Sequence, residues 1–309
     1  MLLEDVEQTI DLAHASLRQA RESNGDERLY VESVGLTEEQ KQGILSLASE
    51  QRAPVDPVAS FLVGATNGIA YKSQIGRLNT YPIPDIPTPK TQGEIFLDIG
   101  CSWGRWSCAA SRKGYKVVGI DPSLGAVMAA KRIARQLGIE AVFIVGDARF
   151  LPFRKGVFNH VFSYSVLQHL SRENVELSVS EISRVLTDGG NCRIQMPTKF
   201  GLRCIYHQFR RGFRDGTGFE VRYWSLPSLT KLFSNRIGTT KFTVDCFFGI
   251  GLQFSDLRFM TPALKTIVVA SEALRLISRF VPPLIWMADS VYVLSVKDST
   301  TQLNAPIEK

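Results

Sequence analysis

The sequence predicts an α/β protein built around a doubly wound parallel sheet. From residue 94 onward, short apolar stretches alternate with amphipathic helical stretches, which is the pattern of parallel strands joined by helices. Before that point, the segment YPIPDIPTPK (residues 81–90) holds four prolines in ten positions. Such a segment is stiff and extended and cannot pair in the centre of a sheet. We therefore expect a helical extension and Pro-rich linker over 1–90 and the α/β domain over 91–300.

The individual elements follow from periodicity, capping residues and turn signals. In the extension, residues 1–22 carry apolar side chains at helical spacing, and Thr37 with Gln40 resembles a capping box for a helix over 37–49. Seven strands are expected at residues 94–98, 116–121, 141–145, 157–163, 191–196, 240–248 and 290–296. The main helices are expected at residues 103–113, 123–137, 171–186, 226–233 and 261–280. Two inserts are expected, a basic one at about 199–225 and a helical one at about 255–287.

Composition excludes a disordered chain. The 309 residues are 44% hydrophobic and 21% charged, which is enough apolar side chain for a full-sized core. The formal net charge of +6 is uneven, because residues 1–50 carry 11 acidic and 4 basic residues while the remainder carries 32 basic and 19 acidic ones. An acidic head on a basic body raises the question of an anionic partner.

The sequence favours a reduced, cytoplasmic protein. Its first residues lack the basic and apolar regions of a signal peptide, and no stretch holds about 18 uninterrupted apolar residues. Five cysteines without a C-x-x-C pair argue against a disulfide framework and against a zinc site. No metal is expected.

Three predicted strand ends carry residues suited to a nucleoside. LDIGCSWGRWS (97–107) is a strand, a Gly-bearing turn and a helix start, Asp121 ends the next strand, and GDARFLPF (146–153) follows the third. Ligands of doubly wound sheets lie at such carboxyl ends. An acid at the position of Asp121 accepts hydrogen bonds from ribose hydroxyls, and Asp147 is placed to accept one from an adenine amino group. A nicotinamide enzyme is disfavoured because Ser102 and Arg105 stand where its fingerprint needs glycines.

These motifs, taken in order, resemble the class I S-adenosylmethionine-dependent methyltransferases, the group that includes the ubiquinone/menaquinone C-methyltransferases. LDIGCSWG, VVGIDPS, GDARFLPF, VFNHVFSYSVLQHL and EISRVLTDGGNCRIQMP resemble successive motifs of that family over residues 94–200, and more weakly to about 297. Three positions depart from the family pattern, namely Ser102, Asn159 and Asp188. The resemblance implies a Rossmann-like seven-stranded sheet, S-adenosylmethionine as cofactor, and a small-molecule or lipid-linked methyl acceptor.

The resemblance also implies a set of residues that hold the cofactor. Asp121 would bind the ribose, Asp147 would contact adenine, and Asp98 would organise the first turn. The simpler interpretations are that Asp121 caps the following helix and that Asp147 caps a loop. The full expected set is Asp98, Gly100, Cys101, Gly104, Asp121, Pro122, Asp147, Ala148, Arg149 and Ser163.

Two residues after the fourth strand are the catalytic candidates. His169 could remove a proton from the acceptor, or it could be a histidine satisfied by local hydrogen bonds. Tyr164 is expected in the pocket, more as a wall than as an acid.

Two segments beyond the fifth strand leave alternatives open. KFGLRCIYHQFRRGFR (199–214) interleaves five basic residues with aromatic ones, and it could clamp an anionic substrate, bind nucleic acid or form a solvated basic face. The apolar stripe of residues 261–287 could pack on the core or lie on a membrane surface as a peripheral contact. The predicted function is methyl transfer to oxygen or carbon of a small or lipid-linked, anionic metabolite. The alternatives are a nucleic-acid methyltransferase, for which no second motif is present, and a non-enzymatic partner that retains the fold.

Overall fold

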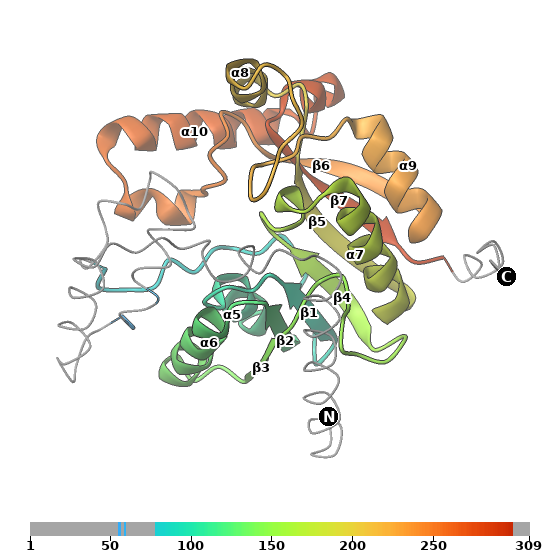
Figure 1. Ribbon diagram of the computed structural model, residues 1–309. Coiled ribbons are helices and arrows are strands. Elements are labelled where there is room, and N and C mark those ends of the chain that lie inside the picture. Colours follow the sequence, from blue (N-terminus) through green and yellow to red (C-terminus); the bar gives the residue numbers. More distant parts are fainter. Residues whose placement is uncertain (1–54, 57–58, 60–77, 299–309) are drawn as a thin grey trace, which may run out of the picture.

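A seven-stranded sheet forms the centre of the computed structural model, which describes residues 55–56, 59 and 78–298 (Figure 1). The helices expected at residues 1–22 and 37–49 lie outside these residues. The strand order is β3-β2-β1-β4-β5-β7-β6, which places the reversal of strand order between β1 and β4. The strands are β1 (Ile95–Ile99), β2 (Lys116–Asp121), β3 (Ala141–Val145), β4 (Phe158–Ser163), β5 (Leu186–Pro197), β6 (Thr240–Cys246) and β7 (Ser290–Val296). The seven strands and the reversal of strand order agree with the Rossmann-like seven-stranded sheet that the resemblance implies.

The sheet is mixed rather than wholly parallel. Strands β1 to β5 pair in parallel, as the sequence predicts. Strand β7 lies between β5 and β6 and runs antiparallel to both. The parallel arrangement expected for the first five strands is confirmed, and β7 adds antiparallel pairing because it enters from the opposite end of the sheet.

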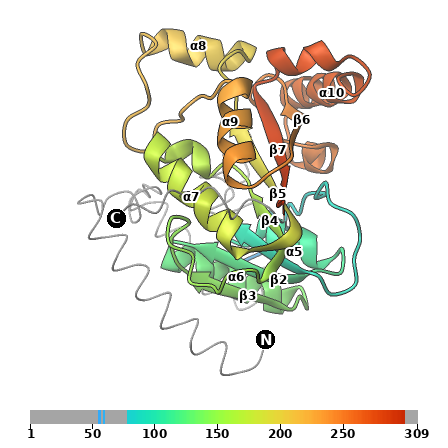
Figure 2. The same cartoon turned by 90° about the vertical axis from the view of Figure 1, so that its right-hand side faces the viewer.

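Helices cover both faces of the sheet, because its strands are apolar on both sides. In β1, Leu97 and Ile99 pack with α7 (Arg172–Val185) and α9 (Leu226–Arg236), whereas Phe96 packs on α5 (Arg105–Ser111). Helices α6 (Leu124–Gln136) and α10 (Pro262–Ile277) lie on the same side as α5 (Figure 2). Helix α8 (Leu202–Arg210) sits beyond the carboxyl end of β5.

Short polar side chains start the crossover helices. Ser123, Ser171 and Ser225 each accept a hydrogen bond from the backbone N–H three residues on, which is the geometry of an N-cap. These caps set where α6, α7 and α9 begin and so fix the loops at the carboxyl ends of the strands. No helix in the described part of the chain is long and apolar enough to cross a membrane.

The fifth strand begins earlier than its sequence suggests. The sequence places the strand at residues 191–196, directly after Gly189 and Gly190, but β5 starts at Leu186, which pairs with Phe158 of β4. The register then shifts before His160, and Gly189 adopts a φ of 73°. The two glycines thus lie in an irregular stretch of the strand rather than in a separate turn.

Candidate active site

One cavity of about 1180 Å³ opens at the carboxyl ends of the parallel strands. Its lining extends from the turn after β1 and the end of β2, past the loop after β4, to α8 and the start of β7. Such a site, at the point where strand order reverses, is where doubly wound sheets bind ligands. The first and second predicted strand ends thus share a cavity with the basic insert.

The turn after β1 brings backbone to the cavity surface. Gly100, Ser102 and Gly104 have φ angles of 72°, 48° and 85°, so every second residue is left-handed. A Cβ on Gly100 would lie 2.1 Å from a methyl carbon of Val166, which explains why glycine is needed there. Ser102, which replaces a family glycine, keeps the left-handed conformation at the cost of the strain that a Cβ brings. Gly100, Cys101 and Ser102 line the cavity, whereas Gly104 packs against Phe143 behind it.

Asp121 holds this turn from the end of β2. Its Oδ2 accepts a hydrogen bond from the Ser102 N–H at 2.9 Å, and its Oδ1 accepts one from the Ser123 N–H at 2.9 Å. Burial raises the pKa of Asp121, and these two N–H donors lower it. Asp121 and Pro122 both line the cavity. Because a carboxylate has about four acceptor positions, Asp121 retains capacity for hydroxyl donors on a ligand.

Two further members of the expected cofactor set lie beneath the cavity and do not line it. Asp98 is 1% exposed and accepts a hydrogen bond of 2.6 Å from the Ser107 hydroxyl. Burial and, to a smaller extent, the charge of Asp121 raise the pKa of Asp98 to about 7, against the lowering effect of Ser107. Ser163 donates to the carbonyl of Ile99 at 3.0 Å. Both residues are placed to support the turn from below.

The third predicted strand end also lies outside the cavity lining. Asp147 and Arg149 form a buried ion pair, with Arg149 Nε 2.9 Å from Oδ1 and Nη2 2.9 Å from Oδ2. The Arg149 N–H donates to the same Oδ1 at 2.8 Å. This pair holds the loop after β3 together. Adenine binding by Asp147, Ala148 and Arg149 stays a prediction, and the ion pair gives Asp147 a structural role already.

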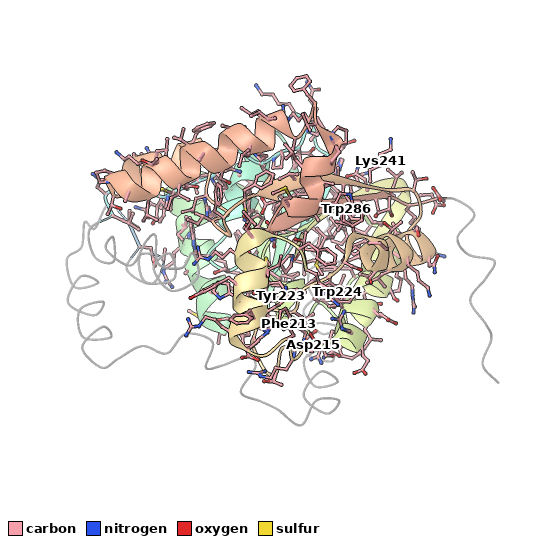
Figure 3. The ribbon with its side chains drawn as sticks, turned by 90° about the horizontal axis from the view of Figure 1, so that it is seen from above. Phe213, Asp215, Tyr223, Trp224, Lys241 and Trp286 are labelled. Atoms are coloured by element: carbon pink, nitrogen blue, oxygen red, sulfur yellow. The ribbon has the colours of Figure 1, made fainter. Side chains whose placement is uncertain are left out.

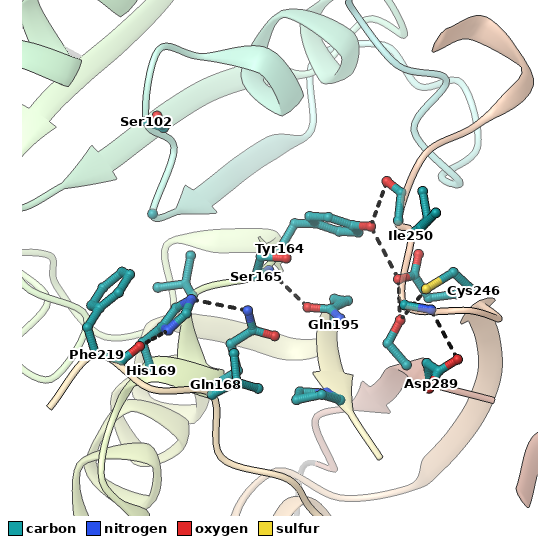
Figure 4. Close-up of a pocket in the computed structure, with 18 of the residues that line it drawn as sticks. Ser102, Tyr164, Ser165, Gln168, His169, Gln195, Phe219, Cys246, Ile250 and Asp289 are labelled. Carbon is teal, nitrogen blue, oxygen red and sulfur yellow. Dashed lines mark hydrogen bonds between the residues drawn. The ribbon is translucent and has the colours of Figure 1, made fainter. Parts of the chain in front are cut away.

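His169 lines the cavity from the short helix η2 (Leu167–His169). Its ring stacks on Phe219 with 3.9 Å between centroids, and its Nδ1 lies 2.7 Å from the Phe219 carbonyl oxygen (Figure 4). A carbonyl accepts only, so Nδ1 carries the proton, and Nε2 accepts from the Gln168 amide at 3.1 Å. Burial lowers the pKa of His169, and the positive charge of Arg222 lowers it further. His169 is therefore neutral at pH 7, with both ring nitrogens engaged.

Tyr164 lies at the centre of a polar cluster that sequence reasoning did not find. Its hydroxyl donates to Asp245 Oδ2 at 3.2 Å and lies 3.1 Å from the Gly251 carbonyl oxygen. Ser290 donates to the same Asp245 oxygen at 2.6 Å. Burial raises the pKa of Tyr164 well above its ordinary value, so Tyr164 stays a neutral donor. Asp245 and Ser290 carried no motif, since β6 and β7 become neighbours only through the sheet order.

Another cavity residue missed from the sequence is Gln195 of β5. Its side-chain oxygen accepts the Ser165 N–H at 3.0 Å, which fixes the loop after β4 (Figure 4). Ser165 has a φ of 58°, a left-handed conformation that this hydrogen bond helps to hold. Gln195 is 5% exposed and lines the cavity.

The far wall of the cavity is one basic face of α8. Arg203, His207 and Arg210 of α8 line it, and their spacing of four and three residues places them on one side of the helix. Arg211, which follows α8, lines the cavity as well. Asp289 anchors this helix, because its Oδ1 accepts the N–H groups of Arg203 and Cys204 at 2.8 and 3.0 Å. The other predicted basic residues, Lys199 and Arg214, are not part of the lining.

The described residues contain no cluster of three or more His, Cys, Asp or Glu side chains that could hold a metal ion. The five cysteines are free and buried.

Comparison with known proteins assigns the core of this sheet to a family. Residues 96–190 match the family model for a methyltransferase domain. Norajmaline N-methyltransferase of Rauvolfia serpentina is 30% identical over 138 residues, which cover 43% of this chain and 46% of that protein. Ubiquinone biosynthesis O-methyltransferase of Brucella ovis is 32% identical over 107 residues, covering 35% and 42% of the two chains.

Two other proteins are also similar to this chain. Sterol 24-C-methyltransferase of Pneumocystis carinii is 32% identical over 102 residues, which cover 32% of this chain and 26% of that protein. The solved YcgJ protein of Bacillus subtilis has a TM-score of 0.46 at 19% identity, covering 68% of this chain and 94% of that one. The chain spans less than half the length of each curated relative named here. Residues 96–190 carry a methyltransferase domain, and the family that its motifs resemble uses S-adenosylmethionine as cofactor.

Proposed function

We propose that this chain transfers a methyl group from S-adenosylmethionine to oxygen or carbon of a small or lipid-linked, anionic metabolite. The observation that carries the proposal is one continuous cavity, lined at one end by Gly100 and Asp121 and at the other by the arginines of α8. The relatives that match the domain are named as methyltransferases that act on nitrogen, oxygen and carbon. Their acceptors differ, so the acceptor has to be inferred from this cavity.

The residues after β1 and β2 fit a nucleoside donor. A Cβ at Gly100 would fill the space beside Val166, and the Asp121 carboxylate faces the same cavity. When bound, S-adenosylmethionine supplies a methyl group on a positively charged sulfur. Asp121 would hold the ribose hydroxyls, and the backbone of Gly100, Cys101 and Ser102 would lie along the remainder of the donor. Transfer of this kind is an in-line displacement, so positioning by these residues is the main requirement.

The basic face of α8 supports an anionic acceptor. Arginine presents a planar fork of donors that suits carboxylates and phosphates. Three arginines and a histidine reach the cavity from α8 and the residue that follows it. Burial lowers the pKa of His207, and the charges of the neighbouring arginines lower it further. His207 is thus neutral at pH 7 and leaves the positive charge on the arginines.

Replacing Arg210 with methionine is expected to raise the acceptor KM about tenfold with little change in kcat. A hydrogen bond to a charged group contributes about 1.5 kcal/mol or more, which corresponds to about tenfold in affinity. Arg210 lines the cavity and is exposed, so its loss should leave the fold intact. Arg214→Met is the matched control, because Arg214 pairs with Glu220 at 2.6 Å and does not line the cavity. Equal KM values for both variants would contradict an anion site on α8.

We also propose that the end of the molecule above the cavity touches an anionic membrane surface. Figure 3 looks down on this end, where α8, α10 and the short helix η4 (Pro282–Met287) lie together, with Phe213 and Trp286 labelled. Phe280 is 87% exposed, Phe209 69% and Trp286 48%. Other large apolar side chains are exposed on or beside these segments, namely Leu202, Ile205, Tyr206, Phe213, Ile267, Val269, Leu276, Ile277, Val281 and Met287.

Charge on the same segments favours lipid headgroups as the occupant. Lys199, Arg210, Lys265 and Arg279 are exposed on or beside α8 and α10. Exposed apolar side chains with basic neighbours are typical of helices that lie in the plane of a membrane. A lipid-linked acceptor would then enter the cavity beside α8.

The double variant Phe280→Ser, Trp286→Ser is expected to lose most of its binding to vesicles of phosphatidylglycerol and phosphatidylcholine. Each serine removes a side chain of about 2 kcal/mol transfer free energy, and vesicle sedimentation measures the bound fraction. Vesicles of phosphatidylcholine alone should bind the wild-type chain more weakly. Leu177→Ser on α7, whose side chain is 46% exposed, is the control and should bind as the wild type does. No wild-type binding to either vesicle would rule out the membrane contact.

The proposed activity is tested in two steps. Isothermal titration with S-adenosylmethionine should show binding, and absence of binding at millimolar donor would overturn the proposal. Incubation with methyl-labelled donor and fractionated aqueous and solvent extracts of cells should then label one fraction, whose product mass identifies the acceptor. Labelling of RNA instead would favour the nucleic-acid alternative. The cytoplasmic location and the proton-accepting role of His169 stay predictions.

A further inference from the structure

We propose that Asp245 takes the proton that a hydroxyl acceptor loses when it is methylated. This inference rests on the proposed methyltransferase function and concerns the acceptor end of the same cavity. Asp245 lies on β6, outside the segment matched by the family model, and no motif of the sequence singled it out.

The carboxylate is held in place at the cavity wall by two hydroxyl groups, one from β7 and one from the residue after β4. Asp245 lines the cavity, and Ser290, the first residue of β7, donates to its Oδ2 at 2.6 Å. The hydroxyl of Tyr164, which follows β4, donates to the same oxygen at 3.2 Å. Both hydrogen bonds end on Oδ2, so Oδ1 retains acceptor capacity for a hydroxyl group of a ligand.

Tyr164 connects this carboxylate to the donor end of the site. Its ring lies 4.8 Å from that of Trp106 on α5, the helix that begins directly after the turn holding Gly100. Its hydroxyl contacts Asp245 three strands away in the sheet order. The acceptor would therefore occupy the space between the Gly100 turn and Asp245, with Tyr164 as its wall, as the sequence predicts for this tyrosine.

Among the groups that face Asp245, the carboxylate is the one suited to accept a proton at neutral pH. Burial raises the pKa of Tyr164, Tyr292 and Cys246 well above their ordinary values, so these three stay protonated. Arg275 is held by Glu272 at 2.7 Å. Burial also raises the pKa of Asp245, whereas the neighbouring hydroxyl groups of Ser290, Tyr292 and Tyr164 and the charge of Arg275 lower it. A raised carboxylate pKa makes a stronger base.

The proposed step balances. The acceptor oxygen forms a bond to the methyl carbon, the bond between that carbon and sulfur breaks, and its electron pair stays on sulfur. The O–H bond of the acceptor breaks, its electron pair stays on oxygen, and the proton passes to Oδ1 of Asp245. No oxidant, metal or further reactant is required.

The first measurement determines the pKa of the Asp245 carboxyl group and needs no methyl acceptor. Carboxyl carbon NMR of the full chain, with Asp245→Asn used to assign the signal, should give a pKa above the ordinary aspartate value. In Ser290→Ala, one donor to the charged form is lost, so the pKa of Asp245 should rise further. Tyr164→Phe should shift it in the same direction. An ordinary pKa that neither variant moves would overturn the proposal.

The second measurement uses the extract fraction that accepts label from the wild-type chain. General bases contribute about 100-fold or more to rate, so Asp245→Asn should lose at least that factor in kcat while its Kd for S-adenosylmethionine changes less than about twofold. In Ser290→Ala the acidic limb of the kcat profile should move to higher pH, which a merely structural role for Asp245 would not produce. Asp188→Asn, an exposed carboxylate at the start of β5, is the control and should match the wild type.

The outcomes separate the two proposals. A chain that binds no donor and labels no fraction contradicts the methyltransferase function, whereas the NMR titration still reports on Asp245. The assignment of Asp245 would be overturned if Asp245→Asn kept the kcat of the wild type. Loss of kcat in His169→Gln, together with a normal kcat in Asp245→Asn, would instead make His169 the base. If Asp245→Asn does not fold, the pH shift in Ser290→Ala decides.

Discussion

Replacing Asp121 with alanine is expected to weaken binding of S-adenosylmethionine by roughly 100-fold. Two hydrogen bonds from ribose hydroxyls to a carboxylate, at about 1.5 kcal/mol each, correspond to that factor. The substitution also leaves the Ser102 and Ser123 N–H groups without their carboxylate acceptor. The turn after β1 should therefore loosen, which adds to the loss. Isothermal titration of the folded variant measures the effect.

A neighbouring substitution separates ribose binding from helix capping. Ser123→Ala removes the side chain that accepts the Ala126 N–H at 3.3 Å, and it should lower the free energy of unfolding by about 1 kcal/mol. Its donor Kd should change less than about threefold, because the Asp121 carboxylate is retained. Unchanged donor binding in Asp121→Ala would show that the donor lies elsewhere in the cavity. Equal losses in both variants would point to the cap rather than the ribose.

Replacing Arg105 with methionine is expected to lower the free energy of unfolding by about 3 to 5 kcal/mol. Arg105 begins α5 and its Nη2 donates to both oxygens of Asp256, at 2.9 and 3.1 Å. The two side chains are 7% and 0% exposed. Removing one partner of a buried ion pair leaves the other charge buried and uncompensated. Urea denaturation of the purified variant measures the change.

The expected loss of stability in Arg105→Met is large because of the position of Asp256. It lies in the short helix η3 (Phe254–Phe259), and its Oδ2 also accepts the Gln253 N–H, so it joins the insert before α10 to the donor end of the sheet. The double variant Arg105→Met, Asp256→Leu should be more stable than Arg105→Met alone, because no buried charge remains. Arg236→Met, which breaks an exposed pair with Glu176, should change stability by less than about 1 kcal/mol. A loss below about 1 kcal/mol in Arg105→Met would contradict the argument.

Local sequence signals predicted the elements well where a strand is apolar and bounded by polar or Gly residues. The limits of β2, β3 and β7 agree with the expected residues 116–121, 141–145 and 290–296. The direction of β7 was not predictable in this way, since the residues of a strand do not encode which end of the sheet it enters. The early start of β5 at Leu186 depends on pairing with Phe158, which is likewise a property of the assembled sheet.

The same distinction applies to the cavity. Gly100 and Asp121 could be placed together from sequence, because parallel neighbours bring their carboxyl ends to one edge. Asp245 and Ser290 could not, since they meet only when β7 inserts beside β6. Asp147 has a residue type that suits adenine, but its pairing with Arg149 depends on a side-chain conformation that spacing does not specify.

The insertion of β7 between β5 and β6 has a consequence for synthesis on the ribosome. β5 and β6 do not pair with each other, and each must wait for the stretch Ser290–Val296 to complete its hydrogen bonds. A nascent chain that has reached residue 289 therefore exposes the unpaired edges of both strands, and such edges are templates for intermolecular pairing. The last strand to emerge closes the centre of this half of the sheet. Premature termination just before it should yield aggregates rather than a shortened enzyme.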